Sequence, residues 1–163
     1  MTGGRAALAA LALAAPACDL GPLGGTSLAG EVVAEPVTDW SFAADRYLIE
    51  IETVAPALLP SARPWFFVHE GTLWLYAMVP PPLELPWVRR LRDVDPRVRI
   101  RVDGKLHAGR AVLVTDPAVL EPLLPGVLRK YHLIETPRAH FVRAPERHPG
   151  TQLQHFFFRV DPR

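Results

Sequence analysis

The sequence contains a single cysteine, Cys18, among its 163 residues. One cysteine cannot form an internal disulfide, so no disulfide framework supports the fold. A surplus of charge is also missing, because 18 lysines and arginines are balanced by 17 aspartates and glutamates, which leaves a net charge of +1. A chain with this balance has no general attraction to polyanions, and we expect no nucleic-acid partner.

Sequence motifs for metal and nucleotide chemistry are absent as well. The six histidines are scattered, with no pair at helical spacing and no HExxH motif, so we expect no metal site. The sequence has no P-loop, no dinucleotide fingerprint and no informative Ser-His-Asp order. Function must therefore be sought in the fold and in local clusters of residues.

The first residues have the features of an export signal. Arg5 precedes the apolar run 6–15, which is too short to span a bilayer but suits the central region of a secretory signal. Ala15-Pro16-Ala17 places small residues directly before Cys18, as in the lipobox of bacterial lipoproteins. We predict a signal peptide over residues 1–17 and lipidation at Cys18, with simple secretion or an incidental cysteine as the alternatives.

This prediction places the protein outside the cytoplasm, as a bacterial membrane lipoprotein or a periplasmic or extracytoplasmic protein. Residues 18–38 mix glycine, proline and small residues without a period, and we expect a flexible tether there. Residues 39–163 are then one folded domain, large enough to enclose a single core.

Alternating apolar and polar residues in some segments, and runs rich in aromatic and β-branched residues in others, predict six strands in this domain. They are residues 47–53, 65–69, 72–78, 97–102, 105–115 and 154–160. Glu70-Gly71 and Asp103-Gly104 are expected to form hairpin turns, and Asp-Gly is the stronger signal of the two. Connections this short join antiparallel neighbours, so we predict a mainly β fold with helical inserts (α+β), a six-stranded antiparallel barrel.

Two helical segments interrupt the strands. Residues 87–93 suggest a short helix with Trp87, Leu91 and Val94 on one face. Asp116-Pro117 is typical of a helix start, with an N-cap followed by proline at the first position. Prolines at 122 and 125 are expected to break this second helix into pieces.

Three segments carry a resemblance to a known family: LIEIET, PWFFVHEGTLWLY and PWVRRLRDVDPRVRIRVDGKLHAGRAVLVTDP. The last segment has a shared pattern at Trp87, Leu91, Asp95, Pro96, Val98, Gly104, Asp116 and Pro117. Together they resemble the FMN-binding split-barrel superfamily, the pyridoxamine phosphate oxidase-like fold, nearest to the deazaflavin-dependent nitroreductase family. The resemblance covers residues 47–131. It implies a split barrel, a homodimer, and FMN or deazaflavin as cofactor.

The resemblance also implies where such a cofactor would lie. The residues at the corresponding positions are Ser61, Arg63, Tyr76, Trp87, Arg89, Arg90 and Lys130. The arginines would hold phosphate, and Tyr76 and Trp87 would stack on the ring. The alternative is that Trp87 anchors the short helix, Tyr76 is an ordinary strand aromatic, and the lysine only complements the helix dipole.

Two departures from the family pattern favour loss of the cofactor. The stretch 56–63 has a serine and an arginine but no glycine, and residues 80–82 are three prolines. Proline lacks the N–H group that a phosphate cradle requires. Some split-barrel proteins bind haem, but nothing in the spacing of His140 and His148 calls for it.

Two hypotheses follow from the sequence. The first is a membrane-anchored oxidoreductase, nitroreductase-like, in which a reduced flavin or deazaflavin passes hydride to a small organic acceptor. The second is a non-catalytic split-barrel module that has lost its cofactor and binds another small molecule or a partner.

Overall fold

The computed structural model describes residues 25–56, 60–80, 82–131 and 154–163. The strands are β1 (Glu31–Val33), β2 (Glu50–Thr53), β3 (Ser61–Ala62), β4 (Trp65–His69), β5 (Thr72–Val79), β6 (Arg97–Val102), β7 (Lys105–Val114) and β8 (Gln154–Pro162). The helical elements are η2 (Ser41–Ala43), α1 (Pro86–Arg89), η3 (Arg90–Val94), α2 (Pro117–Leu120), η4 (Glu121–Leu123) and α3 (Leu124–Tyr131).

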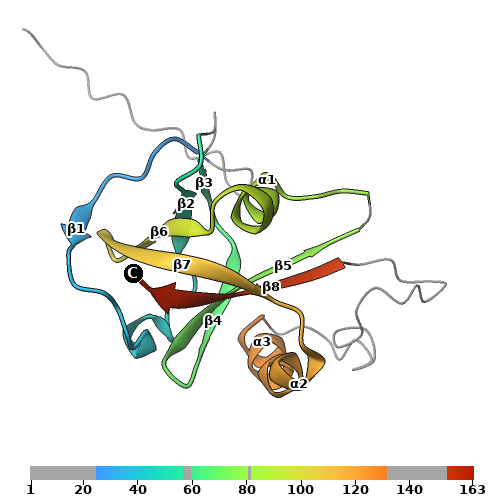
Figure 1. Cartoon of the computed structure of the whole chain (residues 1–163). Coiled ribbons are helices and arrows are strands. Elements are labelled where there is room, and N and C mark those ends of the chain that lie inside the picture. Colours follow the sequence, from blue (N-terminus) through green and yellow to red (C-terminus); the bar gives the residue numbers. More distant parts are fainter. Residues whose placement is uncertain (1–24, 57–59, 81, 132–153) are drawn as a thin grey trace, which may run out of the picture.

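The strands form one curled, mainly antiparallel sheet (Figure 1). Its order is β3-β2-β6-β7-β8-β5-β4, and β1 adds parallel to β7. All six predicted strands are present, as β2 and β4 to β8. The predicted count of six is wrong, because the short β1 and β3 also join the sheet. The sheet is an open half-barrel, since its two edges are β4 and the two-residue β3.

Both predicted hairpin turns are confirmed. Glu70-Gly71 joins β4 to β5, and Asp103-Gly104 joins β6 to β7. All four residues have positive φ, between 49° and 78°. Positive φ at both central positions is what a two-residue turn with the right twist requires.

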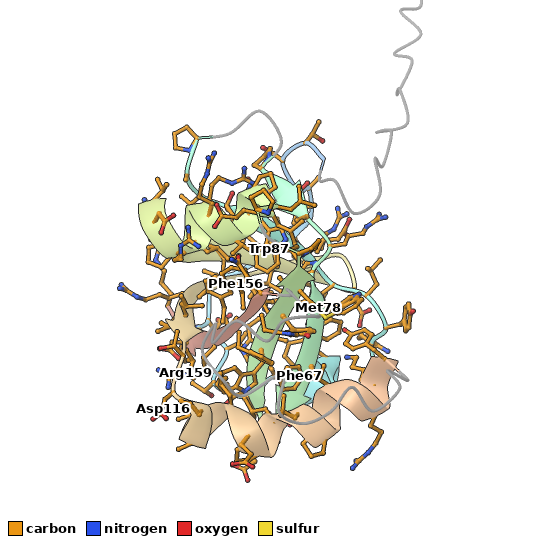
Figure 2. All side chains as sticks on the ribbon, turned by 90° about the vertical axis from the view of Figure 1, so that its right-hand side faces the viewer. Phe67, Met78, Trp87, Asp116, Phe156 and Arg159 are labelled. Carbon is orange, nitrogen blue, oxygen red and sulfur yellow. The ribbon has the colours of Figure 1, made fainter. Side chains whose placement is uncertain are left out.

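Two hydrophobic cores lie on opposite faces of the strands. The first fills the inside of the half-barrel and takes side chains from all six predicted strands as well as from α1. The second lies between β4, β5 and β8 and the helices α2 and α3. Figure 2 shows α1 on one side of the strands with Trp87 beneath it, and α2 and α3 on the other side near Phe67. Because β5 and the centre of β8 are covered on both faces, Leu73–Val79 and Phe156–Phe158 are continuous apolar runs rather than alternating ones.

The helical segments follow the predicted start and break points. Asp116 caps α2, since its Oδ1 accepts a hydrogen bond of 2.9 Å from the N–H of Ala118. Helix α1 continues into a π-helical turn, η3. The prediction that Val94 lies on the buried face is wrong, because it is 66 % exposed. A π turn holds one more residue than an α turn, which rotates Val94 away from the side that buries Leu91.

Residues 25–33, here called the N-terminal strap, cross the outer face of the sheet. Ile51 and Ile100 point inward, so their neighbours along the strands point outward. The strap contacts those outward groups strand by strand: Gly25 on β3, Leu28 on β2 and Ala29 on β6, before β1 pairs with β7. We expected a flexible tether over 18–38, but this part of it belongs to the fold.

Candidate functional site

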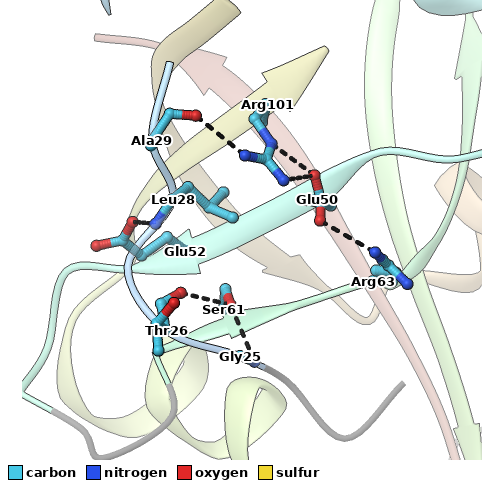
Figure 3. Close-up of polar contacts among 9 residues, drawn as sticks. All are labelled: Gly25, Thr26, Leu28, Ala29, Glu50, Glu52, Ser61, Arg63 and Arg101. Atoms are coloured by element: carbon cyan, nitrogen blue, oxygen red, sulfur yellow. Dashed lines mark hydrogen bonds and ion pairs between the residues drawn. The ribbon is translucent and has the colours of Figure 1, made fainter. Parts of the chain in front are cut away.

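The corner where the family resemblance would place a phosphate is held by Ser61 on β3. This side chain is buried, at 7 % exposure. Its hydroxyl accepts a hydrogen bond of 3.0 Å from the N–H of Gly25 and donates one of 2.8 Å to the carbonyl of Thr26 (Figure 3). The backbones of Gly25 and Ser61 also bond in both directions, at 3.2 and 3.3 Å. The hydroxyl predicted to bind a cofactor therefore holds the strap.

Arg63, the second predicted phosphate ligand, lies beside a carboxylate. Its Nη2 is 3.4 Å from Oε1 of Glu50 on β2, with both side chains partly buried. Oε2 of Glu50 accepts a 2.5 Å hydrogen bond from Nε of Arg101 on β6 (Figure 3). Glu50 thus lies between two guanidinium groups and offsets much of their positive charge at this corner.

A second carboxylate continues this arrangement along β2. Glu52 is only 7 % exposed, and Nη2 of Arg99 donates to both of its oxygens at 2.6 Å. The same carboxylate accepts a 2.7 Å bond from the N–H of Leu28 in the strap. A buried charge needs such partners, because an unpaired one is costly to remove from water. Glu52 therefore links the barrel to the strap.

Arg89 and Arg90 form the remaining basic group at the corner. Nε of Arg90 donates a 2.7 Å hydrogen bond to Oγ1 of Thr53, whose hydroxyl donates to the carbonyl of Pro60 at 3.2 Å. Burial, and then repulsion by Arg89, lower the pKa of Arg90. Arg89 is exposed. These two guanidinium groups repel each other, so an anion bound next to them would be favoured.

The two predicted stacking residues lie in the cores. Trp87 is 4 % exposed and packs against Phe158, with ring centroids 5.8 Å apart. Tyr76 is 1 % exposed, and its hydroxyl is 3.0 Å from Nδ1 of His155. Burial raises the pKa of Tyr76 well above its ordinary value. With both rings covered by protein, the stacking wall that the resemblance implies is not present in this arrangement.

Lys130 lies on α3, away from the corner. Its Nζ is 3.4 Å from the centroid of the Phe66 ring and donates a 3.3 Å hydrogen bond to the carbonyl of Ala44. Burial lowers its pKa to about 8, although Asp45 acts in the opposite direction. The adjacent Tyr131 hydroxyl bonds both backbone groups of Phe66, at 2.7 and 2.6 Å. These contacts fasten α3 to β4 and give both residues structural partners.

The predicted site residues thus fall into separate places. Ser61 contacts the strap and Arg63 contacts Glu50 at the start of β2. Arg90 bonds Thr53 at the other end of β2, with Arg89 next to it in the chain. Trp87 belongs to the inner core, while Tyr76 and Lys130 lie toward α3.

A turn follows β5 at the described prolines Pro80 and Pro82. The N–H of Leu83 donates to the carbonyl of Pro80 at 2.9 Å, which closes a turn. This carbonyl is an acceptor, and proline nitrogens donate nothing. Pro80 and Pro82 therefore present no donors to a phosphate.

Three functional partners at the corner were missed by sequence reasoning: Glu50, Glu52 and Thr53. The signal for the glutamates was present, because Glu50 and Glu52 have the same two-residue spacing as Arg99 and Arg101. The pairing of β2 with β6 sets Glu50 opposite Arg101 and Glu52 opposite Arg99. Only knowledge of that pairing turns the two patterns into ion pairs.

Comparison with known proteins adds no family to this description, since no family model and no curated protein matches the chain. The fold alone defines the class: a mainly β protein whose curled antiparallel sheet is an open half-barrel, loosely compatible with a split barrel.

Several predictions fall outside the described residues: the signal peptide over 1–17, lipidation at Cys18, and the histidines at 140 and 148. Within the described ranges, no group of three or more histidine, cysteine or acidic side chains is placed to hold a metal ion. None of the helices in that part of the chain combines the length and the apolar character needed to cross a bilayer.

Proposed function

We propose that this protein is a non-catalytic half-barrel binding module whose cofactor corner has been taken over by its own N-terminal strap. The observation that carries the proposal is the hydroxyl of Ser61, which is used on both sides by Gly25 and Thr26 at 3.0 and 2.8 Å. A phosphate at this corner would have to displace the strap before it could meet that hydroxyl.

Two further observations support loss of the cofactor. Trp87 and Tyr76 are buried in separate cores, so neither ring face is open to a flavin. The guanidinium group of Arg63 lies against Glu50, and a phosphate there would meet a carboxylate as well as a cation. Because the carboxylate of Glu50 repels an anion, binding beside Arg63 would gain little net attraction.

One observation favours the oxidoreductase hypothesis as a second candidate. Arg89 and Arg90 bring two guanidinium groups together beside the corner, and the pKa of Arg90 is lowered partly by Arg89. An anion there would relieve the repulsion. The activity would be hydride transfer from a reduced flavin or deazaflavin to a small organic acceptor, with these arginines on the cofactor phosphate.

Titration of the purified full-length protein with FMN and with a deazaflavin, followed by fluorescence, separates the two candidates. For the binding module we expect no saturable change up to about 1 mM, a concentration that detects binding as weak as about 4 kcal/mol. Saturable binding that is lost in the double variant Arg89→Gln/Arg90→Gln, but kept in Arg110→Gln, would favour the oxidoreductase instead. Arg110 is the matched control because it is an exposed arginine on β7, separated from β2 by β6.

We further propose that the protein is exported and held at a bacterial membrane by a lipid on Cys18, with residues 1–17 as the signal peptide. Its partners would then be the membrane surface, a small-molecule ligand and a second copy of the chain. Labelling of cells with an alkyne fatty acid should mark the protein and should fail for Cys18→Ala. Labelling that is unchanged by this substitution would exclude the anchor.

A further inference from the structure

A hollow of about 360 Å³ lies at the β6–β7 turn, lined by Phe42, Val102, Asp103, Lys105 and His107. It is distinct from the corner described above. The corner residue Thr53 pairs with Val98, and Val102 lies four residues further along β6, at about 13 Å for the usual strand rise. The mouth of a β-barrel is a common position for small-molecule sites.

His107 is the polar group at the base of this hollow. It is opposite Ile100 across the β6–β7 pair, so its side chain belongs to the inner face of the sheet. It is 6 % exposed, and its Nδ1 is buried with no hydrogen-bond partner among the described residues. A buried polar atom that is left without a hydrogen bond costs the fold about 1–3 kcal/mol. The ring of His107 lines the hollow, so another edge of the ring, not this closed-off nitrogen, is what a ligand would meet there.

Aromatic rings surround the histidine. Trp40 meets it edge-on at 5.6 Å between centroids, and Phe42, on η2, is 5.5 Å away. Phe42 is 48 % exposed, so it has free surface for a ligand. The buried Nε1 of Trp40 also has no partner within the described part of the chain. An apolar wall with a few polar groups is the usual composition of a small-molecule site.

The edge of the hollow carries charges of both signs, because Glu31 stands opposite Lys105 across the β1–β7 pair. Asp103 forms an ion pair with Arg46, whose Nη2 is 2.7 Å from Oδ2, so its negative charge is offset. Lys105 is exposed and lines the same hollow. Burial, and then the charge of Lys105, lower the pKa of His107 and so favour its neutral ring. Lys105 is thus the cation that a ligand carboxylate would meet at this edge, although Glu31 offsets part of its charge.

We propose that this hollow binds a small aromatic carboxylate, with its ring against Phe42, its carboxylate near Lys105 and a hydrogen bond to the ring of His107. The volume sets the size, because about 360 Å³ is near the lower end of ligand pockets, which start at about 300 Å³. The proposal does not depend on the fate of the corner, since it shares none of the corner residues.

Benzoate is the probe, and the full-length protein is titrated with it while the ring signals of His107 are followed by NMR. We expect saturable shifts with a dissociation constant of about 1 mM. This is a binding free energy of about 4 kcal/mol, which is reasonable for so small a ligand. Lys105→Gln should weaken benzoate binding about tenfold, or about 1.4 kcal/mol. Arg110→Gln, the matched control on the same strand, should leave the affinity unchanged.

Two further comparisons test the other contacts. Cyclohexanecarboxylate and benzamide should each bind at least about fivefold more weakly than benzoate, because one lacks the aromatic ring and the other the charge. His107→Gln is followed by calorimetry and should reduce benzoate affinity while the unfolding transition remains cooperative.

The proposal is overturned by shifts that do not saturate, by equal affinity in Lys105→Gln, or by equal binding of the two analogues. If His107→Gln fails to fold, the Lys105 variant and the analogues still decide the question. FMN binding at the corner, or its absence, would not alter any of these results.

Discussion

Leu28→Ala tests whether the N-terminal strap contributes to the stability of the half-barrel. Leu28 is 8 % exposed, and its backbone N–H is bonded to Glu52. Loss of its buried carbons should cost about 2 kcal/mol by transfer alone, which is at the lower end of the ~2–5 kcal/mol measured for such truncations. For a chain of this size the melting temperature should fall by about 4–8 °C.

The assay is urea unfolding, combined with hydrogen exchange at the strap amides. Val32→Ala is the matched control, because Val32 lies in the same strap but is 71 % exposed, and its loss should stay within about 0.5 kcal/mol. Hydrogen exchange at the backbone amide of residue 28 should be faster in Leu28→Ala than in the unsubstituted protein, and unchanged in Val32→Ala. If both variants unfold at the same urea concentration, the strap is an attached tail and the reasoning about the corner is wrong.

Three other substitutions have defined outcomes. In Gly30→Ala the new Cβ would lie 2.4 Å from the carbonyl oxygen of Gly104, so we expect a loss of about 1–3 kcal/mol in urea unfolding, and a loss below about 0.5 kcal/mol would contradict this geometry. Tyr131→Phe leaves both backbone groups of Phe66 without their partner and should cost about 1–3 kcal/mol in thermal unfolding, with an unchanged melting temperature as the contrary result. The pKa of Lys130 is lowered to about 8 in the fold from 10.5, so between these values the unfolded chain binds more protons and stability should rise with pH. Lys130→Met should remove that rise, and urea unfolding at pH 7, 8, 9 and 10 compares the two proteins; an identical pH dependence would refute the shift.

The strands were predictable because their signals are local. Alternation over residues 97–102 and the turn Asp103-Gly104 depend only on neighbours in the sequence. The same holds for the cap at Asp116. Sequence reasoning failed where one element depends on a distant one. Nothing within 31–33 shows that it will pair with β7, because its partner lies more than seventy residues away.

The candidate site was less predictable for the same reason. The resemblance implies a cofactor contact for Ser61, whereas in the structure its hydroxyl accepts a hydrogen bond from Gly25, 36 residues earlier. Alternation over 97–102 places Arg99 and Arg101 on one face of a strand but does not show that they pair with glutamates on β2. Composition shows which groups are available, but only the three-dimensional arrangement decides which of them are already in use.

The strap also sets the cost of binding at the corner. A phosphate that reached Ser61 would first break its two hydrogen bonds to Gly25 and Thr26, each worth about 0.5–1.5 kcal/mol net. The sum, about 1–3 kcal/mol, would weaken the apparent affinity by about 5–150-fold, because the open form is rare. A ligand at the β6–β7 hollow carries no such penalty, since it displaces none of these bonds. The strap therefore lowers the affinity of the corner for an anion but has no such effect at the hollow.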